Sequence, residues 1–470
     1  MTGRPDFIGT GEPARLIPVV ADTNKEQRAA SIFLAALRSV FEFRKAMLGS
    51  LSIRVGSRAT LDAWTEITFH QDKNAKAEKK KQDRPDGLLI LNTGKKQWRA
   101  LIEAKIDNAE IDETQLKEYI QQAKQHKIDA VITISNQFVA LPTHHPIKLP
   151  KNLTKGVDLY HWSWSYIRTQ ASLLTEDGAI ESPDQRFIID EVLRYLAHKT
   201  SGIAGFSSMN REWKDVVGKV KSKSTLSKGS EEVENTVSSW HQEQRDLCLI
   251  LSRKLAQPVS LKLSRAHRTD PVKRLHDDAE NLVRDKTLIC KLEIPNAAAD
   301  LVVTADLSTR TIFCGMWLAA PQDKKSTSAR VHWLTRQLAK TNPQNMYIKA
   351  FRKGHAEDTQ KPLSEVLEDA SVLDATNSNS APTGFEVFYM VDLAGKFSGN
   401  QVFIRELEEA VPHFYEQAGE RLRAWVAPPP KMKRKESAGT SGKDESERRE
   451  VIGIDDTDLN RPGLGGTSNS

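Results

Sequence analysis

Two short segments of the sequence carry acidic and basic side chains at a spacing that could support chemistry. The first places Asp86 directly before the apolar run 88–91, and the second places Glu103 and Lys105 within the run 98–106. Side chains alternate along a strand, so Glu103 and Lys105 point to the same face. A carboxylate in an apolar strand is costly to bury without a partner. An Asp and a Glu that converge on one face become compatible with burial if a divalent cation lies between them, and such oxygen ligands suit Mg²⁺.

The same residues also allow a purely structural interpretation. In that interpretation Glu103 and Lys105 form an ion pair, and Asp86 caps a turn with Gly87. The Pro-Asp-Gly sequence at the start of one strand, the hairpin that follows and the flanking helices together favour a site. In a site, Lys105 could orient or help to deprotonate an attacking water, or stabilise charge that develops on a phosphate.

The elements expected around these segments alternate between helical and strand periodicity. We predict, in order, a helix at 23–43, strands at 61–69, 87–91 and 98–106, a helix at 110–127, strands at 130–135 and 159–164, and helices at 165–174 and 185–198. This order predicts an α/β domain over residues 23–199, with a mixed central sheet flanked by helices.

Within this order, Pro85-Asp86 followed by Glu103-Ala104-Lys105 resembles the PD-(D/E)XK phosphodiesterase superfamily, which has the restriction-endonuclease-like fold. The resemblance covers well under half of the chain. It implies hydrolysis of phosphodiester bonds in nucleic acid, DNA in the first instance, with Mg²⁺ or alternatively Mn²⁺. It further implies that Asp86 and Glu103 are metal ligands, that the Ala104 carbonyl is a further ligand, and that Lys105 lies at the attacking water. The expected activity is therefore that of a metal-dependent deoxyribonuclease.

Members of this superfamily often carry a further acid on the first helix, and Glu26 is the candidate. Thr23-x-x-Glu26 has the pattern of a capping box, in which the Glu satisfies a backbone N–H. Glu26 also shares the inward stripe of Phe33 and Leu37, from which it could reach a metal. Both alternatives remain open. Glu66 is another candidate acid, although a solvated position is favoured for it.

The helix after the motif strand contains Gln115 and Tyr119, which share one helical face. They match the QxxxY element of the exonuclease-like branch, which implies contacts near the active site and to the substrate backbone. Many members of that branch bind an iron–sulfur cluster through four cysteines. The only cysteines here are Cys248, Cys290 and Cys314, far apart in the sequence, so we expect no iron–sulfur cluster and no CxxC metal site.

Basic residues crowd the loop before Asp86 and could hold phosphates in a salt-dependent manner, although a solvated loop explains them equally well. The residues predicted to bind substrate in this way are Lys79, Lys80, Lys81 and Arg84.

The rest of the chain divides by composition. We expect a flexible N-terminus at 1–22, a basic linker at 200–230, an α+β domain with a mostly antiparallel sheet at 231–426, and a disordered tail at 427–470. The second domain is not recognised; it could bind a partner protein or form a homodimer. The net charge of +6 comes from the part before residue 231, because the remainder is slightly acidic.

The 470-residue sequence has no apolar run long enough to cross a membrane and no secretory signal, so we expect a cytoplasmic protein without membrane contact. Two alternatives to a nuclease remain on the same fold. One is a nucleic-acid-binding protein that cleaves nothing, and the other is a partner-regulated effector, for example of a mobile element or of phage defence.

Overall fold

The structure is a computed structural model that describes residues 5–18, 21, 24–69, 84–94, 96–377, 379–427 and 429. All its helices and strands belong to the first of two units, residues 1–427. Apart from Ala427 and Pro429, the predicted tail at 427–470 lies outside the described residues. None of the helices in the described part of the chain is long and apolar enough to span a membrane.

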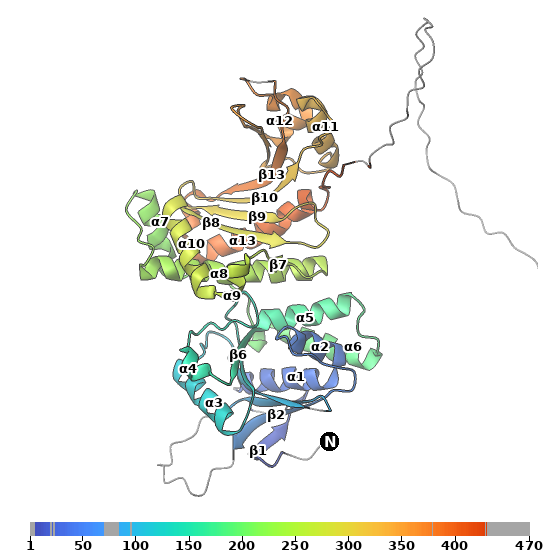
Figure 1. The fold of residues 1–470 in the computed structure, drawn as a ribbon, viewed down its shortest axis with the longest axis vertical. Helices are drawn as coiled ribbons and strands as arrows, with labels where there is room; N and C mark the ends of the chain where they lie inside the picture. Colours follow the sequence, from blue (N-terminus) through green and yellow to red (C-terminus); the bar gives the residue numbers. More distant parts are fainter. Residues whose placement is uncertain are drawn as a thin grey trace, which may run out of the picture. The chain divides into compact units, whose positions relative to one another are not determined.

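The first sheet has six strands, which neighbour one another in the order in which they occur in the sequence. Figure 1 labels β1, β2 and β6 of this sheet. They are β1 (Ile8–Pro13), β2 (Thr60–Phe69), β3 (Gly87–Asn92), β4 (Gln97–Ala104), β5 (Ala130–Ser135) and β6 (Asp158–Ser163). Strands β1 to β4 pair antiparallel, whereas β4, β5 and β6 pair parallel. The mixed sheet predicted for the α/β domain is therefore confirmed.

Helices cover both faces of this sheet. They are α1 (Lys25–Ser39), α2 (Phe41–Gly49), α3 (Glu113–Gln125), α4 (Lys151–Thr154), α5 (Trp164–Glu176) and α6 (Pro183–Ala197). On one face, the apolar side chains of α1, α2, α5 and α6 pack with every second strand residue, around Phe33 and the fully buried Trp162 and Trp164. On the other face, α3 packs through Leu116 and Ile120. Sequence periodicity predicted one helix over 23–43, but the chain breaks at Val40, whose backbone is extended.

The N-terminal segment, predicted to be flexible at 1–22, contains strand β1 instead. Its sequence, Ile-Gly-Thr-Gly-Glu-Pro, has one apolar side chain, and that side chain, Ile8, is fully buried. The strand pairs with β2 through two register shifts. Hydropathy alone missed it because two glycines and a proline remove the alternating pattern that marks a half-buried strand.

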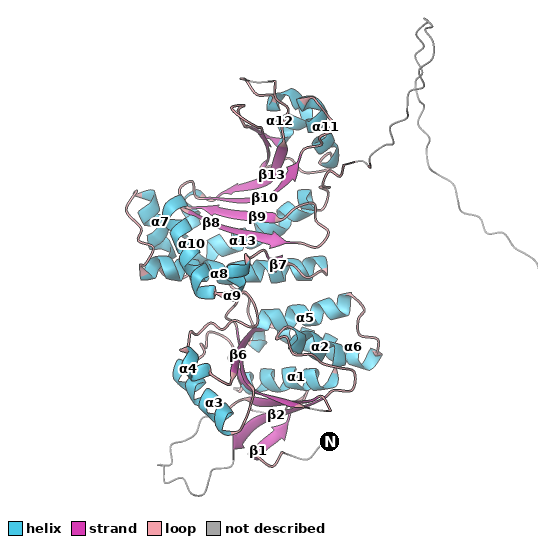
Figure 2. Cartoon of the chain, viewed as in Figure 1, coloured by secondary structure: helices cyan, strands magenta, loops and turns pink. Residues whose placement is uncertain are grey.

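The second sheet has seven strands and is antiparallel throughout, as predicted. In chain order they are β7 (Ser260–Leu261), β8 (Thr287–Glu293), β9 (Leu301–Asp306), β10 (Thr311–Ala319), β11 (Met346–Phe351), β12 (Thr359–Pro362) and β13 (Gly384–Asp392). The accompanying helices are α7 (Trp213–Lys221), α8 (Glu231–Leu255), α9 (Arg265–Thr269), α10 (Pro271–Asp285), α11 (Thr327–Gln337), α12 (Leu363–Glu368) and α13 (Asn400–Phe414) (Figure 2). The final helix was expected to reach residue 425, but α13 ends at Phe414 and continues only as a π-helical turn.

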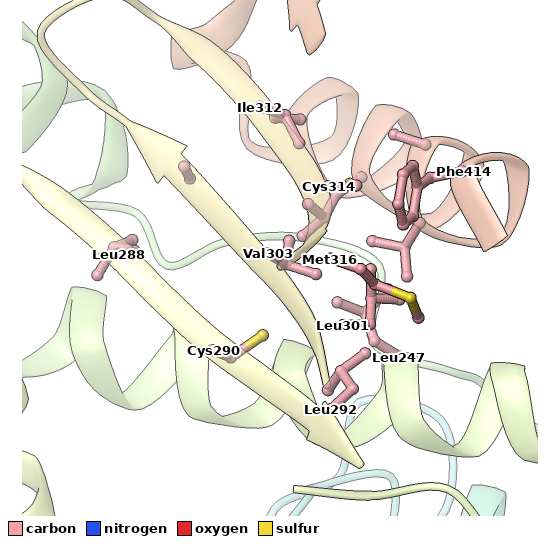
Figure 3. Close-up of a cluster of buried hydrophobic side chains, with 14 of the residues drawn as sticks. Leu247, Leu288, Cys290, Leu292, Leu301, Val303, Ile312, Cys314, Met316 and Phe414 are labelled. Atoms are coloured by element: carbon pink, nitrogen blue, oxygen red, sulfur yellow. The ribbon is translucent and has the colours of Figure 1, made fainter. Parts of the chain in front are cut away.

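Strands β8, β9 and β10 direct alternate side chains into the second core. Figure 3 shows Cys290, Val303 and Cys314 on these strands facing the same side as Phe414 of α13 and Leu247 of α8. All three cysteines of the chain are free and buried in this core. Burial raises the pKa of the Cys248 thiol to about 12, so in the folded chain it acts as a small apolar side chain.

The segment predicted as a basic linker, 200–230, is part of this core. Trp213 is fully buried, its ring packs on Phe397 and Phe403, and its Nε1 donates a hydrogen bond to the Phe397 carbonyl (3.0 Å). Val216 and Val220 lie on the same buried face of α7. Lysines on the exposed face of a helix gave the segment its linker-like composition, although its apolar residues recur at helical spacing.

Helix α8 contributes to both cores, through Val237 and Leu247 to the second and through Leu249 to the first. It also buries Glu243, whose two carboxylate oxygens have no hydrogen-bond partner. Burial, and then the negative charges of Asp246 and Glu408, raise the pKa of Glu243 well above its usual value. The carboxyl group is therefore neutral in the folded chain at a pH where the unfolded chain ionises it.

We expect Trp213→Ala to lower the free energy of unfolding by about 3–5 kcal/mol, because it leaves a large cavity in the second core. The control is Lys214→Ala, which changes the exposed neighbouring residue and should cost about 0.5 kcal/mol or less. Chemical denaturation measures both. A loss for Trp213→Ala no larger than that for Lys214→Ala would mean that 200–230 is a linker after all.

Glu243→Gln should stabilise the chain more at pH 8 than at pH 4.5. The pKa of Glu243 is raised in the folded state, so the unfolded state releases a proton that the folded state keeps, and the free energy of unfolding falls as pH rises above about 4.3. Glu243→Gln has no ionisable group at this position, so this fall in the free energy of unfolding should be absent from the variant. Urea denaturation at the two pH values, with the exposed Glu234→Gln on the same helix as control, checks this. An equal effect of Glu243→Gln at both pH values would contradict it.

Candidate active site

The hairpin of β3 and β4 brings both motif segments to one end of the first sheet. Gly87 pairs with Ile102, so Asp86, just before β3, lies beside Glu103 and Ala104 near the end of β4. On its other side β4 pairs parallel with β5, where Glu103 faces Thr133. The candidate residues therefore stand on an inner strand, held by neighbours on both sides.

Glu103 and Lys105 point to the same face, as strand alternation predicted, and they form an ion pair. Lys105 Nζ donates a hydrogen bond to Glu103 Oε1 at 2.6 Å. The Glu103 side chain is only 3% exposed and that of Lys105 17%. Burial works to lower the pKa of Lys105, but the charges of Glu103, Glu26 and Asp86 raise it above its usual value, so the lysine stays charged.

Asp86 is held by backbone groups from two strands. Its Oδ2 accepts a hydrogen bond from the Ala104 N–H (2.8 Å), and its carbonyl accepts one from the Glu66 N–H (3.2 Å). Continuing the β3–β4 register would put Pro85 opposite Ala104. The Ala104 N–H instead binds the Asp86 side chain, and Pro85 has no N–H with which to extend the β3–β4 ladder.

Gly87 has a separate reason to be glycine. A Cβ there would lie 2.5 Å from Leu34 Cδ1 of helix α1 and 3.1 Å from the Trp64 carbonyl. The missing side chain lets α1 approach the strand closely and brings the first turn of that helix to the site.

Glu26, in that first turn, faces the motif. Its Oε1 accepts a hydrogen bond from the Ile106 N–H (3.4 Å), and its Oε2 lies 3.8 Å from Lys105 Nζ. Helix α1 begins at Lys25 without a side-chain cap, while Thr23, the expected capping residue, lies outside the described residues. Glu26 thus reaches the motif strand, as the inward alternative predicted, whereas the capping-box alternative depends on Thr23 and stays open.

Gln115 and Tyr119 on α3 stabilise the site through a chain of hydrogen bonds. Gln115 Nε2 donates to the Tyr119 hydroxyl (3.0 Å), and that hydroxyl donates to the Arg84 carbonyl (3.3 Å). Tyr119 is 1% exposed. Burial raises the pKa of Glu103 overall, whereas Lys105 and then Tyr119 act to lower it. Tyr119 therefore lies buried next to Glu103 and Gln115 contacts Tyr119, while contacts of the pair with a substrate backbone stay a prediction.

A pocket of about 560 Å³ opens at this end of the sheet. Its charged lining residues are Lys25, Glu26, Glu66, Arg84, Asp86 and Asp107. Glu103 and Lys105 are not among the lining residues, so they lie behind Asp86. Lys79, Lys80 and Lys81, predicted to bind substrate, lie outside the described residues.

Glu66 was expected to be solvated, but its side chain is only 18% exposed and forms an ion pair with Arg84 at the pocket. A register shift in β1–β2 pairing lies beside it, and its backbone has a φ of +53°. Such a bulge re-aims a side chain. The alternating strand pattern cannot predict a bulge, so the sequence offered Glu66 as a candidate acid but did not predict its low exposure.

Three further residues at the site, Lys25, Asp107 and Trp164, were not identified from the sequence. Lys25 and Asp107 line the pocket and form a 3.4 Å ion pair, and Trp164 Nε1 donates to the Lys105 carbonyl at 2.8 Å. The sequence signal that could have identified Lys25 and Asp107 is their nearness to predicted site residues, since Lys25 precedes Glu26 and Asp107 follows Lys105 by two residues.

In the part of the chain that is described, no group of three or more His, Cys, Asp or Glu side chains could hold a metal ion. A two-carboxylate site, as Mg²⁺ commonly uses together with water, fits the residues better. Glu103 Oε2 is buried without a hydrogen-bond partner. Burial, and then the charge of Glu103, raise the pKa of Asp86 to about 8. A divalent cation between the two carboxyl groups would reduce the repulsion between Asp86 and Glu103 and would give Glu103 Oε2 a partner.

Comparison of the chain with protein-family models, with curated proteins and with solved structures finds no match. The arrangement of residues therefore has to carry the functional argument.

We expect Lys105→Met to lower the free energy of unfolding by about 3 kcal/mol, because it leaves the buried Glu103 carboxylate without its cation. Adding Glu103→Gln to this variant should recover most of the loss. Chemical denaturation of the two single variants and the double variant gives the coupling energy.

The matched control is Lys117→Met, which breaks the exposed 2.6 Å ion pair with Glu113 and should cost about 0.5 kcal/mol or less. Additive losses for Lys105→Met and Glu103→Gln would show that the buried pair does not stabilise the fold.

Proposed function

We propose that the chain is a Mg²⁺-dependent nuclease that hydrolyses phosphodiester bonds of DNA, on a fold of the restriction-endonuclease type. The observation that carries this proposal is the convergence of Asp86, Glu103 and Lys105 at one end of the mixed sheet, with one Glu103 oxygen buried and unpartnered. Apart from the additional helix α2, the order of helices and strands around them, from α1 to β5, matches the order predicted from the sequence, which supports the proposal.

Asp86 and Glu103 would hold the cation, with the Ala104 carbonyl and Glu26 as further oxygen donors, and Mn²⁺ could replace Mg²⁺. When bound, such an ion neutralises the scissile phosphate and lowers the pKa of a bound water. The protein's own contribution is rigidity. Asp86 is fixed by the Ala104 N–H, and the Lys105 backbone is fixed by Trp164, so the two segments keep their spacing.

Lys105 carries its charge behind the two carboxyl groups, where it would orient a water and stabilise negative charge on the phosphate. Arg84 and Lys25 line the pocket and would contact substrate phosphates. Gln115 and Tyr119 would act through Glu103 and the Arg84 backbone, since Tyr119 is buried.

Two observations favour the alternative of a binding or partner-regulated protein. The 2.6 Å pair with Lys105 already occupies Glu103 Oε1, and Glu103 does not line the pocket. In addition, Ile289 and Trp317 are about half exposed on strands of the second sheet, where a partner protein or a second copy could cover them. Both observations fit a chain that is inactive until a partner binds.

The test is incubation of the purified chain with linear duplex, circular duplex and single-stranded DNA, in Mg²⁺ or in EDTA. Cleavage should require the cation, and Asp86→Asn, Glu103→Gln and Lys105→Met should each lower the rate by about 10²–10⁴-fold. Glu113→Gln, a carboxylate exposed on α3, is the matched control and should cleave normally. Cleavage that survives EDTA or Glu103→Gln would contradict the site.

The same substrates separate the remaining possibilities. Salt-dependent DNA binding that is unchanged in Glu103→Gln, without any cleavage, would favour the binding alternative. Cleavage of circles would identify an endonuclease. A requirement for a free end, weakened by Gln115→Ala, would support the exonuclease-like interpretation of Gln115 and Tyr119.

A further inference from the structure

A second pocket, of about 550 Å³, lies between α5, α6 and α8. It shares no lining residue with the pocket beside Asp86. Four of its lining residues are cationic, namely Arg168 from α5, Arg194 from α6, and Arg253 and Lys254 from α8, and none is acidic. Three helices from distant parts of the sequence therefore bring positive charge to one concave surface.

Two of these cations, Arg168 and Lys254, make no side-chain hydrogen bond or ion pair within the described residues, although the charge of Arg168 acts on the buried Asp246. Arg194 pairs with Glu191, and the two side chains are 77% and 43% exposed. Arg168 and Lys254 can therefore bind an anion without breaking a hydrogen bond or an ion pair.

Arg253 is held in place by hydroxyl groups rather than by a carboxylate. Its Nη1 donates to Thr169 Oγ1 (2.6 Å) and to Ser165 Oγ (3.3 Å). Burial lowers the pKa of Arg253, the positive charge of Arg168 lowers it further, and the negative charges of Asp246 and Glu408 oppose this. Asp246 already accepts hydrogen bonds from the Phe206 N–H and from Ser165, so it neutralises the arginines only from a distance.

Stabilisation of helix dipoles explains part of this arrangement but not all of it. Arg194, Arg253 and Lys254 lie in the last turns of α6 and α8, where cations favour the helix C-terminus. Arg168 lies in the first half of α5, where a cation gains nothing from the dipole. Its position beside Arg253 is therefore a cost that an anion in the pocket would offset.

Leu193, Ala197 and Ile250 give the rest of the wall an apolar surface beside Ser172. A concave site that combines an apolar wall with several convergent cations suits a compact ligand with a flat apolar body and a multiply charged end. A nucleic-acid strand would instead need a continuous basic groove. Arginine guanidinium groups bind phosphate oxygens in a bidentate manner, which favours a phosphorylated ligand over a simple carboxylate.

We propose that the pocket between α5, α6 and α8 binds a nucleoside polyphosphate, with its phosphates on Arg168, Arg253 and Lys254 and its base against Leu193 and Ile250. This site is independent of the proposed nuclease function, and its test does not depend on cleavage.

The experiment is calorimetric titration of the full chain with ATP, pyrophosphate and adenosine, at 150 mM salt and with EDTA present. ATP should bind more tightly than pyrophosphate, and adenosine should bind much more weakly than either. Arg168→Gln combined with Lys254→Gln should weaken ATP binding by at least about tenfold, as expected for the loss of two charge-assisted contacts. Neither side chain has a hydrogen bond or an ion pair to lose within the described residues, so the melting temperature of the free chain should stay nearly constant.

The matched control is Lys151→Gln combined with Arg265→Gln, which removes two exposed cations elsewhere and should bind ATP normally. Glu103→Gln should also bind ATP normally, which separates this pocket from the candidate active site. If both double variants weakened ATP binding equally, the effect would come from the net charge of the chain, and the proposal would be overturned. Absence of ATP binding, or binding of a single-stranded oligonucleotide in its place, would overturn it as well.

Discussion

The candidate site depends on the burial of one carboxylate at the end of an inner strand. Glu103 is 3% exposed, and an unpaired charge at that depth is too costly to keep. Lys105 supplies the compensating cation, Tyr119 approaches from α3, and Asp86 is fixed one strand away by the Ala104 N–H. Each of these neighbours is positioned by a different element, so the hairpin, α1 and α3 must all be in place before the site exists.

The second constraint is that α8 is shared between two cores. Val237 and Leu247 pack with the antiparallel sheet, whereas Leu249 packs with the mixed one. A helix with two apolar faces leaves little surface for polar groups, which explains why Glu243 and Asp246 are buried within it. The burial of both carboxyl groups reduces stability, and the charges of Arg253 and Arg168 offset part of that cost for Asp246.

Much of the first domain could be predicted from sequence because its signals are local. Strand alternation put Glu103 and Lys105 on one face, and helical spacing put Gln115 beside Tyr119. What could not be predicted depends on contacts distant in sequence. Glu26 had two equally good local explanations, and its hydrogen bond with the Ile106 N–H depends on a residue 80 positions away. The bulge at Glu66 follows from pairing with a glycine-rich strand that hydropathy did not detect. The basic pocket unites residues up to 86 positions apart, from Arg168 to Lys254, and no single segment of the sequence marks it.

Helix α5 links two regions that were described separately. Its first residue, Trp164, holds the Lys105 carbonyl at the candidate active site, and Arg168, one turn later, lines the basic pocket. Four helical residues span only about 6 Å along the axis. The contact that fixes Trp164 against the Lys105 backbone therefore also sets the height at which Arg168 stands in the basic pocket.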